Sequence, residues 1–384
     1  MSKKIRVLQV TKFYPPHIGG IETTTKDIVD SLKSSGQYEI EVLAYGDGKK
    51  DVFEDKDGVK IIRAGTQLNI SHQPIAKNYY SLIKSAIREF RPDIIHFHYP
   101  NPYAAHWLLK AMKKYKFKGK LILHWHADII RQKFLRTFFI HQNKTLLKRA
   151  DVIIATSPNY LNDTDYLPHY KDKVRIIPSC ISENRTVITE EEIKKSKDIK
   201  AQYKGKNICF FYGRHTAYKG LEYLIDSDQY LDKDKIQIII AGKGELTEEL
   251  EETAKPFSNI FFVGKLSEED INSYFLACDI FVFPSVTRNE AFGLALAEAM
   301  YYGKPACTFT IKGSGVNWVS LNGVTGLEAP DYDSKKFAEN ISTLCNDNEM
   351  RNRMSEKARE RGTSLFTKDK FAIAINGLYN SLGN

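Results

Sequence analysis

The sequence predicts an α/β protein built from two doubly wound domains, each with a parallel sheet. The chain has 384 residues, which exceeds the size at which a single hydrophobic core stops growing. Short runs rich in Val, Ile and Leu alternate with amphipathic helical stretches, a pattern typical of a parallel sheet with helices on both faces. This alternation stops at a polar stretch, residues 182–200, and then starts again. We therefore expect an N-terminal domain over residues 1–180 and a C-terminal domain over residues 181–366.

Seven strands are expected in the N-terminal domain because their sequences are almost continuously aliphatic, as in strands that are buried on both faces. In chain order they are IRVLQV (5–10), EIEVLAY (39–45), VKIIRA (59–64), DIIHFH (93–98), KLILHWH (120–126), DVIIATS (151–157) and VRIIPS (174–179). Five more are expected in the C-terminal domain: NICFFYG (207–213), IQIIIAG (236–242), NIFFVG (259–264), DIFVFPS (279–285) and KPACTF (304–309). The final helical stretch, residues 367–384, fits either domain.

The composition is that of an ordinary globular protein. Hydrophobic residues make up 42% and charged residues 27% of the chain, which excludes a largely disordered or fibrous protein. The five cysteines lie far apart without a C-x-x-C pair and are expected to be reduced core thiols. The N-terminal apolar run is too short for a signal peptide, and no later run reaches the ~18 apolar residues of a spanning helix. We therefore expect a cytoplasmic protein.

The net charge of +9 is concentrated in one region. Residues 71–150 contain sixteen Lys and Arg against three acidic residues. Within this region KAMKKYKFKGK (110–120) and RQKFLRTFFIHQNKTLLKR (131–149) interleave basic with apolar side chains. This pattern predicts peripheral binding to an anionic membrane surface. A solubilising charged face and a nucleic-acid-binding patch are the alternatives, the second without any recognisable reading motif.

Open parallel sheets bind ligands at the carboxyl ends of their strands, so polar residues and glycines there are candidate site residues. Gly19 and Gly20 follow the first strand and precede a helix, which lets an anion approach the backbone and the helix N-terminus. A tight turn is the alternative explanation for this pair.

The strand 207–213 ends in Gly213, and Arg214 and Lys219 bracket the loop that follows. A guanidinium fork and an ammonium group together suit a diphosphate. Two solvated surface cations are the alternative. The position directly after a buried strand favours the functional interpretation.

Two strands of the N-terminal domain end in paired histidines, in HFHYP and HWHAD. Histidines at i and i+2 point to the same face of a sheet. For His96, His98 and His124 we favour local hydrogen bonding over metal ligation, because a metal site also needs outer-shell partners. His126, last in its strand and two residues before Asp128, is the histidine expected to contact substrate.

The stretch RNEAFGLALAEAM follows a strand and places Glu290 and Glu298 eight residues apart. On one helix they are about 80° and ~12 Å apart, too far to flank a single bond as glycosidase carboxylates do. We therefore expect them to contact two parts of one extended ligand. Glu290 is expected at the helix start, beside the free amides of Phe292, Gly293 and Leu294. A helix cap for Glu290 and an exposed helix face for Glu298 are the alternatives.

Several of these motifs occur together in one known family. GGIE, HWHAD, GRHTAYKG, FVFPSVTRNEAFGLALAEAMYYGKP and NGVTGLEAP, in this order, resemble the retaining glycosyltransferases of family 4. The resemblance spans nearly the whole chain and implies the GT-B architecture, in which two Rossmann-like domains face each other across a donor cleft. HADIIRQK, TSPNYL and GSGVNWV further resemble bacterial enzymes that add mannose or related hexoses to lipid-linked surface polysaccharides such as O-antigen, a part of lipopolysaccharide, or capsule. PSCISEN departs from the family pattern because the usual interdomain glycine is absent.

The resemblance implies roles for the residues that match its motifs. Arg214 and Lys219 would hold the donor diphosphate in place of a divalent metal, so neither a metal nor another cofactor is expected. Glu290 would contact the transferred sugar and Glu298 the ribose hydroxyls. His126 would meet the sugar near its reacting face.

The remaining candidates are backbone positions and neighbours of the base. The amides of Phe292, Gly293 and Leu294 would contact the sugar and the phosphates, and Gly19 and Gly20 would approach the phosphates from the other domain. On the donor side the candidates also include the strand-end Gly213 and, near the nucleotide base, Gly264 and Lys265. On the acceptor side the candidates are His98 and Asp128.

The expected function is therefore retaining transfer of a hexose, with mannose favoured, from a GDP- or UDP-linked donor to a hydroxyl of a lipid-linked glycan. The enzyme would work at the inner face of the cell membrane. A nucleotide-sugar epimerase and a sugar phosphorylase on the same architecture are the alternatives among enzymes. A basic nucleic-acid-binding protein is the alternative from another class.

Overall fold

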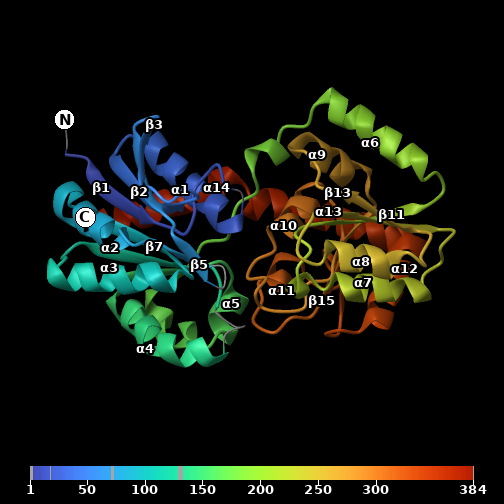
Figure 1. Ribbon diagram of the computed structural model, residues 1–384. Helices are drawn as coiled ribbons and strands as arrows, with labels where there is room; N and C mark the ends of the chain where they lie inside the picture. Colours follow the sequence, from blue (N-terminus) through green and yellow to red (C-terminus); the bar gives the residue numbers. More distant parts are fainter. Residues whose placement is uncertain (1–2, 18, 71–72, 129–132, 384) are drawn as a thin grey trace. The chain divides into compact units, whose positions relative to one another are not determined.

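The computed structural model describes residues 3–17, 19–70, 73–128 and 133–383, with side chains outside residues 133–138. The chain forms two compact units, each with its own sheet and helices (Figure 1). Unit 1 comprises residues 1–156, 164–177 and 371–384, and unit 2 comprises residues 157–163 and 178–370.

This division differs from the predicted one in two places. The chain leaves unit 1 between Ile177 and Pro178, three residues before the predicted end of the N-terminal domain at residue 180. Helix α5 (Pro158–Asp163), expected in the N-terminal domain, belongs to unit 2 because it contacts helix α11 (Val316–Val319) there.

Unit 1 contains an eight-stranded sheet in the order β10-β9-β8-β7-β1-β2-β4-β3. The strands are β1 (Ile5–Val10), β2 (Tyr38–Gly46), β3 (Val52–Lys56), β4 (Val59–Gly65), β7 (Ile94–Tyr99), β8 (Lys120–Trp125), β9 (Val152–Ala155) and β10 (Val174–Ile176). All seven predicted strands are present, and their neighbours pair in parallel except at β3. Their aliphatic side chains form the core on both faces of the sheet.

Strand β3 corrects the expectation of a wholly parallel sheet. It pairs with β4 in antiparallel register through a two-residue turn at Asp57 and Gly58, whose φ angles are 54° and 79°. Positive φ at both turn positions is the geometry of the tightest hairpins, for which Asp-Gly is a favoured sequence. A second, separate hairpin of β5 (Leu68–Ile70) and β6 (Gln73–Ile75) was not predicted either.

The helices of unit 1 include the end of the chain. They are α1 (Gly20–Ser34), α2 (Tyr79–Ser85) with a π-helical extension (Ala86–Phe90), α3 (Pro102–Lys114), α4 (Lys133–Arg149), a 3₁₀ segment (Leu167–Lys173) and α14 (Lys368–Gly383). Helix α14, red in Figure 1, belongs to unit 1 from residue 371. It is fixed there by hydrogen bonds from Gln9 Nε2 to Tyr379 Oη and from Tyr38 Oη to Asn380 Oδ1, both of 2.9 Å. The last helix therefore packs in unit 1 from residue 371.

Unit 2 contains a six-stranded parallel sheet in the order β13-β12-β11-β14-β15-β16. Its strands are β11 (Asn207–Tyr212), β12 (Ile236–Ala241), β13 (Ile260–Gly264), β14 (Ile280–Phe283), β15 (Ala306–Phe309) and the unpredicted β16 (Gly326–Ala329). Its helices, besides α5 and α11, are α6 (Glu190–Gln202), α7 (Leu221–Ser227), α8 (Thr247–Ala254), α9 (Glu268–Ala277), α10 (Leu294–Tyr301), α12 (Ser334–Asn346) and α13 (Asn348–Leu365), with 3₁₀ turns at Glu183–Arg185, Ala217–Lys219 and Asp228–Tyr230. All five cysteines are buried thiols.

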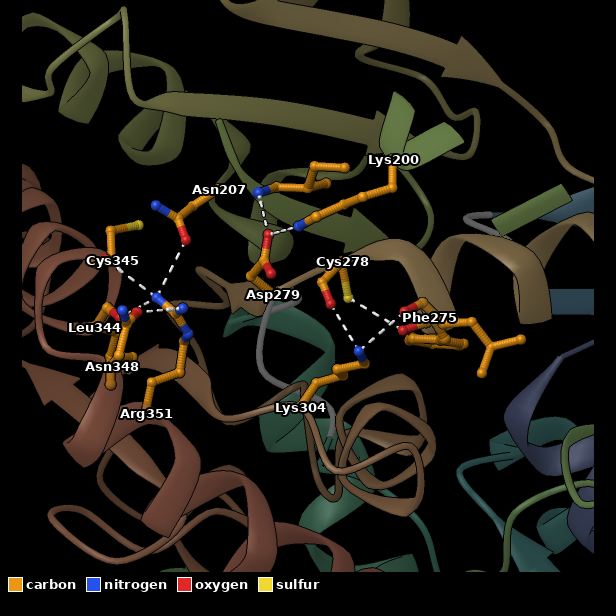
Figure 2. Close-up of polar contacts among 12 residues, drawn as sticks. Lys200, Asn207, Phe275, Cys278, Asp279, Lys304, Leu344, Cys345, Asn348 and Arg351 are labelled. Atoms are coloured by element: carbon orange, nitrogen blue, oxygen red, sulfur yellow. Dashed lines mark hydrogen bonds and ion pairs between the residues drawn. The ribbon is translucent and has the colours of Figure 1, made fainter. Parts of the chain in front are cut away.

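Polar side chains fix the amino ends of the central strands of unit 2 (Figure 2). Asp279, directly before β14, accepts a hydrogen bond of 2.7 Å from the amide of Ile208 in β11 and pairs with Lys200 of α6. On the other side, Arg351 of α13 donates to Asn207 Oδ1 over 3.1 Å. These contacts occupy one edge of the sheet, so the loops at the carboxyl edge are the ones available for ligands.

Candidate functional site

The strand order of unit 2 reverses between β11 and β14. At such a reversal the loops after the two strands diverge, and the carboxyl ends of the strands are the usual ligand position in open α/β sheets. The loop after β11 contains Arg214 and Lys219, and the loop after β14 contains Glu290. The sequence candidates therefore lie on the two loops that flank the reversal.

Lys219 is held firmly at this position. It ends a 3₁₀ turn and is only 7% exposed. Gly220 follows with φ 61°, and a Cβ at this glycine would clash with the carbonyl oxygen of Pro284. The glycine thus allows the loop after β11 to pack against the end of β14. As a result the Lys219 ammonium lies 4.6 Å from the ring centroid of Phe283.

Glu290 forms an ion pair with Lys219. Its Oε2 also accepts a hydrogen bond of 3.3 Å from Ser285 Oγ, and its backbone carbonyl accepts one from Ser314 Oγ. Sequence reasoning assigned Glu290 and Lys219 to different parts of a ligand and did not predict their contact. Both serines were also missed, since nothing in FPSVTRNE or KGSGVN shows that Ser285 reaches the carboxylate of Glu290 and Ser314 its backbone carbonyl.

Glu290 does not stand at the start of a helix, which corrects the prediction. Helix α10 begins at Leu294 after Gly293, whose φ is 89°. Because Gly293 is left-handed, the helix begins only at Leu294, about one turn after Glu290. The helical separation predicted for Glu290 and Glu298 therefore does not apply. The amides of Phe292, Gly293 and Leu294 do lie at the helix start, and in the described part of the chain none of them donates a hydrogen bond.

Glu298 is buried within α10 and paired with a cation that the sequence did not reveal. Its side chain is 7% exposed, and its Oε1 lies 3.4 Å from Nε of Arg185, which is 3% exposed. Burial raises the pKa of Glu298 to about 7, although Arg185 opposes this shift. Any hydroxyl that binds Glu298 has to share it with Arg185. The expected contact with ribose remains a prediction.

Arg185 is tied to the same unit by further polar contacts. Its Nη2 lies 2.9 Å from Glu268 Oε2, and its Nη1 donates to Asn272 Oδ1 over 3.0 Å. Asn272 in turn donates to Glu192 Oε1 over 2.8 Å. The segment after the missing family glycine is therefore joined to α6, α9 and α10 by a buried polar network. A lone Arg in the polar stretch SENRT gave no sign of this role.

The other donor-side candidates lie at neighbouring strand ends. Arg214 is exposed, and its side chain has no polar partner within the described residues. Gly213 donates to the carbonyl of Ala241 at the end of β12 over 3.1 Å. Gly264, with φ 71°, ends β13 next to the exposed Lys265. These positions line one edge of the sheet, as parallel strands require.

The reversal in unit 1 lies between β1 and β7, and Gly19 and Gly20 follow β1 there. Helix α1 begins at Gly20 with Gly19 as its N-cap. A Cβ at Gly20 would meet no atom within 4 Å, so packing within the described chain does not require this glycine. The space over Gly20 is compatible with a ligand at the helix N-terminus.

Four histidines of unit 1 stack in its interior. The ring centroids of His124 and His126 are 3.9 Å apart, and those of His96 and His98 are 4.6 Å apart at an interplanar angle of 3°. Burial lowers the pKa of His126 to about 3 and holds the pKa values of the other three well below the usual range. All four imidazoles are therefore neutral at physiological pH.

Ring geometry argues against a metal ion among these histidines. The ligand nitrogens of His96, His98 and His124 all lie within 4.8 Å of one another. However, the lone pair of an imidazole lies in the ring plane, and the parallel planes of His96 and His98 do not intersect at a common ion. Both nitrogens of His98 are also hydrogen-bonded, to His126 and Gln9. The predicted local hydrogen bonding therefore holds for His98 and for Nδ1 of His96, but it is wrong for His124, whose ring nitrogens have no partner among the described residues.

Two acceptor-side candidates are corrected by the structure. His98 is 1% exposed and enclosed by protein groups, so it cannot contact an acceptor directly. Asp128 is buried, and its Oδ1 accepts a hydrogen bond of 2.8 Å from Trp125 Nε1. Within the described residues, His98 and Oδ1 of Asp128 take part in interior hydrogen bonds. HADIIRQK, which includes Asp128, continues into residues 129–132, outside the described residues.

The geometry of unit 2 suits an anionic ligand that also carries hydroxyl groups. A buried ammonium and the unpaired amides at the start of α10 favour negative charge. The Glu290 carboxylate, a strong hydrogen-bond acceptor, lies in contact with that ammonium. Binding of an anion at Lys219 would thus bring its hydroxyl-bearing neighbour to Glu290.

Two sequence families together match most of the chain. Residues 18–185 match the family described as Glycosyltransferase Family 4, and residues 192–361 match the family described as Glycosyl transferases group 1. The chain is similar over 384 residues, at 28% identity, to the O-antigen chain mannosyltransferase C of Escherichia coli, with 98% of this chain and 99% of the relative covered. It is also similar, at 28% identity over 373 residues, to the D-rhamnosyltransferase WbpZ of Pseudomonas aeruginosa, with 94% and 92% covered.

Solved structures show the same fold at low sequence identity. Sucrose-phosphate synthase from Thermosynechococcus elongatus matches with a TM-score of 0.80 at 20% identity, with 99% of each chain covered. Anabaena HepE in complex with UDP-glucose matches with a TM-score of 0.78 at 18% identity, with 98% of this chain and 100% of that chain covered. The predicted fold class, two Rossmann-like domains of the GT-B type, is confirmed.

Proposed function

The chain belongs to the bacterial polysaccharide-type glycosyltransferases of family 4, and from this premise we propose its reaction. It transfers a hexose, with mannose favoured, from a nucleotide diphosphate sugar to a hydroxyl of a lipid-linked glycan in cell-surface polysaccharide synthesis, with retention of configuration. The observation that carries the donor assignment is the Lys219–Glu290 ion pair at the strand reversal of unit 2. The names of two relatives, a mannosyltransferase and a rhamnosyltransferase, support a hexose-type donor.

Departure of the diphosphate is the costly step of such a transfer, because negative charge develops on the leaving oxygen. Lys219 is fixed in place before the ligand arrives, so its charge stabilises that oxygen without reorganisation. The exposed Arg214 adds a planar fork for the outer phosphate oxygens. Two protein cations would thereby supply the charge stabilisation for which other transferases use a metal, and we propose that this enzyme needs none.

Glu290 is proposed to accept hydrogen bonds from the hydroxyls of the transferred sugar. Its contacts with Lys219 and Ser285 leave the carboxylate oriented, and a carboxylate oxygen accepts more than one hydrogen bond. When a phosphate binds Lys219, the ammonium is shared between the two anions. Glu290 then lies beside the sugar attached to that phosphate, which is where orientation contributes to rate.

Release of nucleoside diphosphate tests the proposed reaction. GDP-mannose, UDP-glucose and ADP-glucose are incubated with the wild-type protein, with and without lipid extracts that contain polyprenyl-linked glycans, and free GDP, UDP or ADP is measured. We expect one donor to release its diphosphate faster in the presence of acceptor, with the sugar in a lipid fraction. Conversion of the donor sugar without release of diphosphate would indicate an epimerase. Release that requires inorganic phosphate and yields a sugar phosphate would indicate a phosphorylase.

We further propose that the lipid-linked acceptor is reached from an anionic membrane surface. Helices α3 and α4 of unit 1 border a groove of about 870 Å³. Its lining combines apolar side chains with basic ones: Leu109, Met112 and Phe117 with Lys110, Lys113, Lys116 and Arg149. Such a surface is complementary to anionic headgroups and to the acyl region beneath them. Part of the basic pattern at 131–149 lies outside the described residues and side chains. None of the described helices has the length and apolar character of a membrane span.

Cosedimentation with vesicles tests the membrane proposal. Wild-type protein is expected to bind vesicles that contain phosphatidylglycerol and to remain unbound with phosphatidylcholine alone. The double variant Lys113→Gln and Lys116→Gln is expected to bind about tenfold more weakly, because each basic residue near such a surface contributes up to ~1 kcal/mol. The matched control changes two exposed lysines of α6 in unit 2, Lys194→Gln and Lys197→Gln. Equal losses in both double variants would contradict a specific membrane face.

A further inference from the structure

A continuous chain of hydrogen bonds runs through the interior of unit 1 from His126 to the C-terminal helix. His126 Nε2 lies 2.9 Å from His98 Nδ1, and His98 Nε2 lies 3.0 Å from Gln9 Oε1. Gln9 Nε2 donates to Tyr379 Oη over 2.9 Å. The Tyr379 hydroxyl is in turn 2.7 Å from His96 Nδ1. Residues from β1, β7 and α14 are thus linked to a single imidazole that directly follows β8.

The direction of these bonds determines which nitrogen of His126 carries its proton. Since Gln9 donates through Nε2, its Oε1 faces His98 as an acceptor, and His98 Nε2 must be protonated. A neutral imidazole has one N–H, so His98 Nδ1 is an acceptor and His126 Nε2 must donate to it. The remaining nitrogen of His126, Nδ1, then carries a lone pair.

Burial keeps this assignment intact because it prevents a second proton from binding. Gln9 and His98 are 0% and 1% exposed, and His126 is 8% exposed. The aromatic groups that face the His126 ring are His98 and His124, and the pKa values of both lie well below the usual range because of burial. A doubly protonated His126 would offer two N–H donors, and the chain of hydrogen bonds provides an acceptor for only one of them.

We propose that Gln9, His98 and Tyr379 are positioning residues that hold His126 as the neutral Nε2–H tautomer and direct its Nδ1 to accept a hydrogen bond from a sugar hydroxyl. The inference rests on the proposed function for the identity of the ligand. The tautomer itself is a property of the protein alone. Within the described residues His126 Nδ1 has no hydrogen-bond partner and His126 is 8% exposed, so Nδ1 is the ring nitrogen left for a ligand.

Through Tyr379, helix α14 takes part in orienting His126. Tyr379 is fully buried, and its hydroxyl accepts the hydrogen bond from Gln9 Nε2. When this hydroxyl donates its own proton to His96 Nδ1, it cannot also donate to Gln9, and it then favours the amide orientation that the structure shows. A flipped amide would present a donor to His98, reverse every bond of the chain and place the proton on His126 Nδ1. A sugar hydroxyl would then face an N–H donor instead of an acceptor. One hydroxyl on α14 therefore selects the hydrogen-bonding character of a residue more than two hundred positions earlier in the chain.

Nitrogen NMR on full-length protein labelled with ¹⁵N-histidine tests the tautomer directly. The His126 signals are assigned with a His126→Gln variant. We expect a pyrrole-type shift for His126 Nε2 and a pyridine-type shift for Nδ1 in the wild type. Tyr379→Phe removes one hydroxyl without changing the ring. Gln9→Met removes the amide carbonyl and the amide NH2 at similar side-chain volume. Both variants are expected to give a mixture of His126 tautomers. Tyr45→Phe, which removes a buried hydroxyl of unit 1 outside the chain of hydrogen bonds, is expected to leave the signals unchanged.

Steady-state kinetics with the donor that the wild type uses complete the test. Tyr379→Phe and Gln9→Met are expected to lower kcat about tenfold with little change in KM for the donor, because a misplaced proton affects each bound complex without removing donor contacts. A pyrrole-type Nδ1 in wild-type His126, or unchanged tautomers in both folded variants, would overturn the inference. An unchanged kcat despite mixed tautomers would overturn the link to catalysis. Failure of the wild type to turn over any donor would refute the proposed function instead, since the NMR result does not depend on a donor.

Discussion

The four stacked histidines predict that unit 1 loses stability in mild acid. The perturbation is a change from pH 7.5 to pH 5.5. All four imidazoles have pKa values far below the usual range because they are buried, with that of His126 at about 3. The unfolded chain takes up protons on these residues near pH 6.5, whereas the folded chain does not. Stability is therefore fully present above pH 6.5 and decreases as the pH falls through that value.

The expected loss follows from proton linkage. At pH 5.5 an unfolded histidine is about 90% protonated, so each buried one lowers the free energy of unfolding by ~1.4 kcal/mol, and four lower it by ~5 kcal/mol. Glu41 in the same unit acts in the opposite direction, because burial raises its pKa to about 7. Protonation of Glu41 in acid removes the cost of keeping its carboxylate buried. Between pH 7.5 and pH 5.5 this adds about 2 kcal/mol to the free energy of unfolding. The net loss expected for unit 1 is about 3 kcal/mol.

Guanidinium unfolding followed by tryptophan fluorescence measures this loss. Trp107 and Trp125 lie in unit 1, so a Trp318→Phe background reports on that unit alone. In this background His124→Leu is expected to reduce the loss between pH 7.5 and pH 5.5 by ~1.4 kcal/mol. It is also expected to raise stability at pH 7.5, because neither ring nitrogen of His124 has a partner among the described residues and an unsatisfied buried group costs ~1–3 kcal/mol.

The matched control is the exposed His106, whose change to Gln is expected to leave the pH dependence as it is. Equal or greater stability of unit 1 at pH 5.5 would refute the reasoning. So would a His124→Leu variant with the same pH dependence as its background.

Further predictions concern the two cations of the candidate donor site and the buried Arg185–Glu298 pair of unit 2. Lys219→Met is expected to lower turnover at least a hundredfold and to cost about 1–3 kcal/mol of stability, because Glu290 loses its partner. Arg214→Ala, at an exposed position, is expected to lower turnover with less than ~0.5 kcal/mol change in unfolding free energy. Near-normal turnover of both variants would contradict the assignment of the donor site to these two cations. Arg185→Met is expected to destabilise unit 2 by about 3–5 kcal/mol in urea unfolding, and adding Glu298→Leu should recover most of that loss, because an unpaired buried charge costs more than an absent pair. Additive losses in the double variant would contradict this account of the pair.

The regular parts of the fold were predictable because their causes are local. Each of the twelve predicted strands is an aliphatic run, and each is present in the structure within a few residues of its expected bounds. Strand β3 was missed because its sequence, VFEDK, is largely charged and fully exposed at the sheet edge. Strand β16 is only four residues long and contains a charged residue, so its sequence gives no periodic signal.

The candidate site was predictable in position but not in its pairings. Strand ends identified Lys219 and Glu290, since topology places polar residues after buried strands at a common edge. Their ion pair depends on how two loops pack around Gly220, and a loop conformation is not encoded by periodicity. Arg185, the partner of Glu298, is brought close only by the tertiary fold, and so is Gln9, the partner of His98. Gln9 did carry one signal, as an uncharged polar residue within an otherwise aliphatic buried strand.

Calorimetric titration of nucleoside diphosphates tests most directly the claim that the Lys219–Glu290 pair marks the donor site. GDP, UDP and ADP are titrated into the wild type, Lys219→Met and the surface control Lys197→Met, whose lysine is exposed on α6. We predict that one nucleotide binds the wild type and Lys197→Met equally and binds Lys219→Met at least tenfold more weakly, since a hydrogen bond to a charged group contributes about 1.5–3 kcal/mol. Equal affinity of that nucleotide for Lys219→Met and the wild type would contradict the central claim.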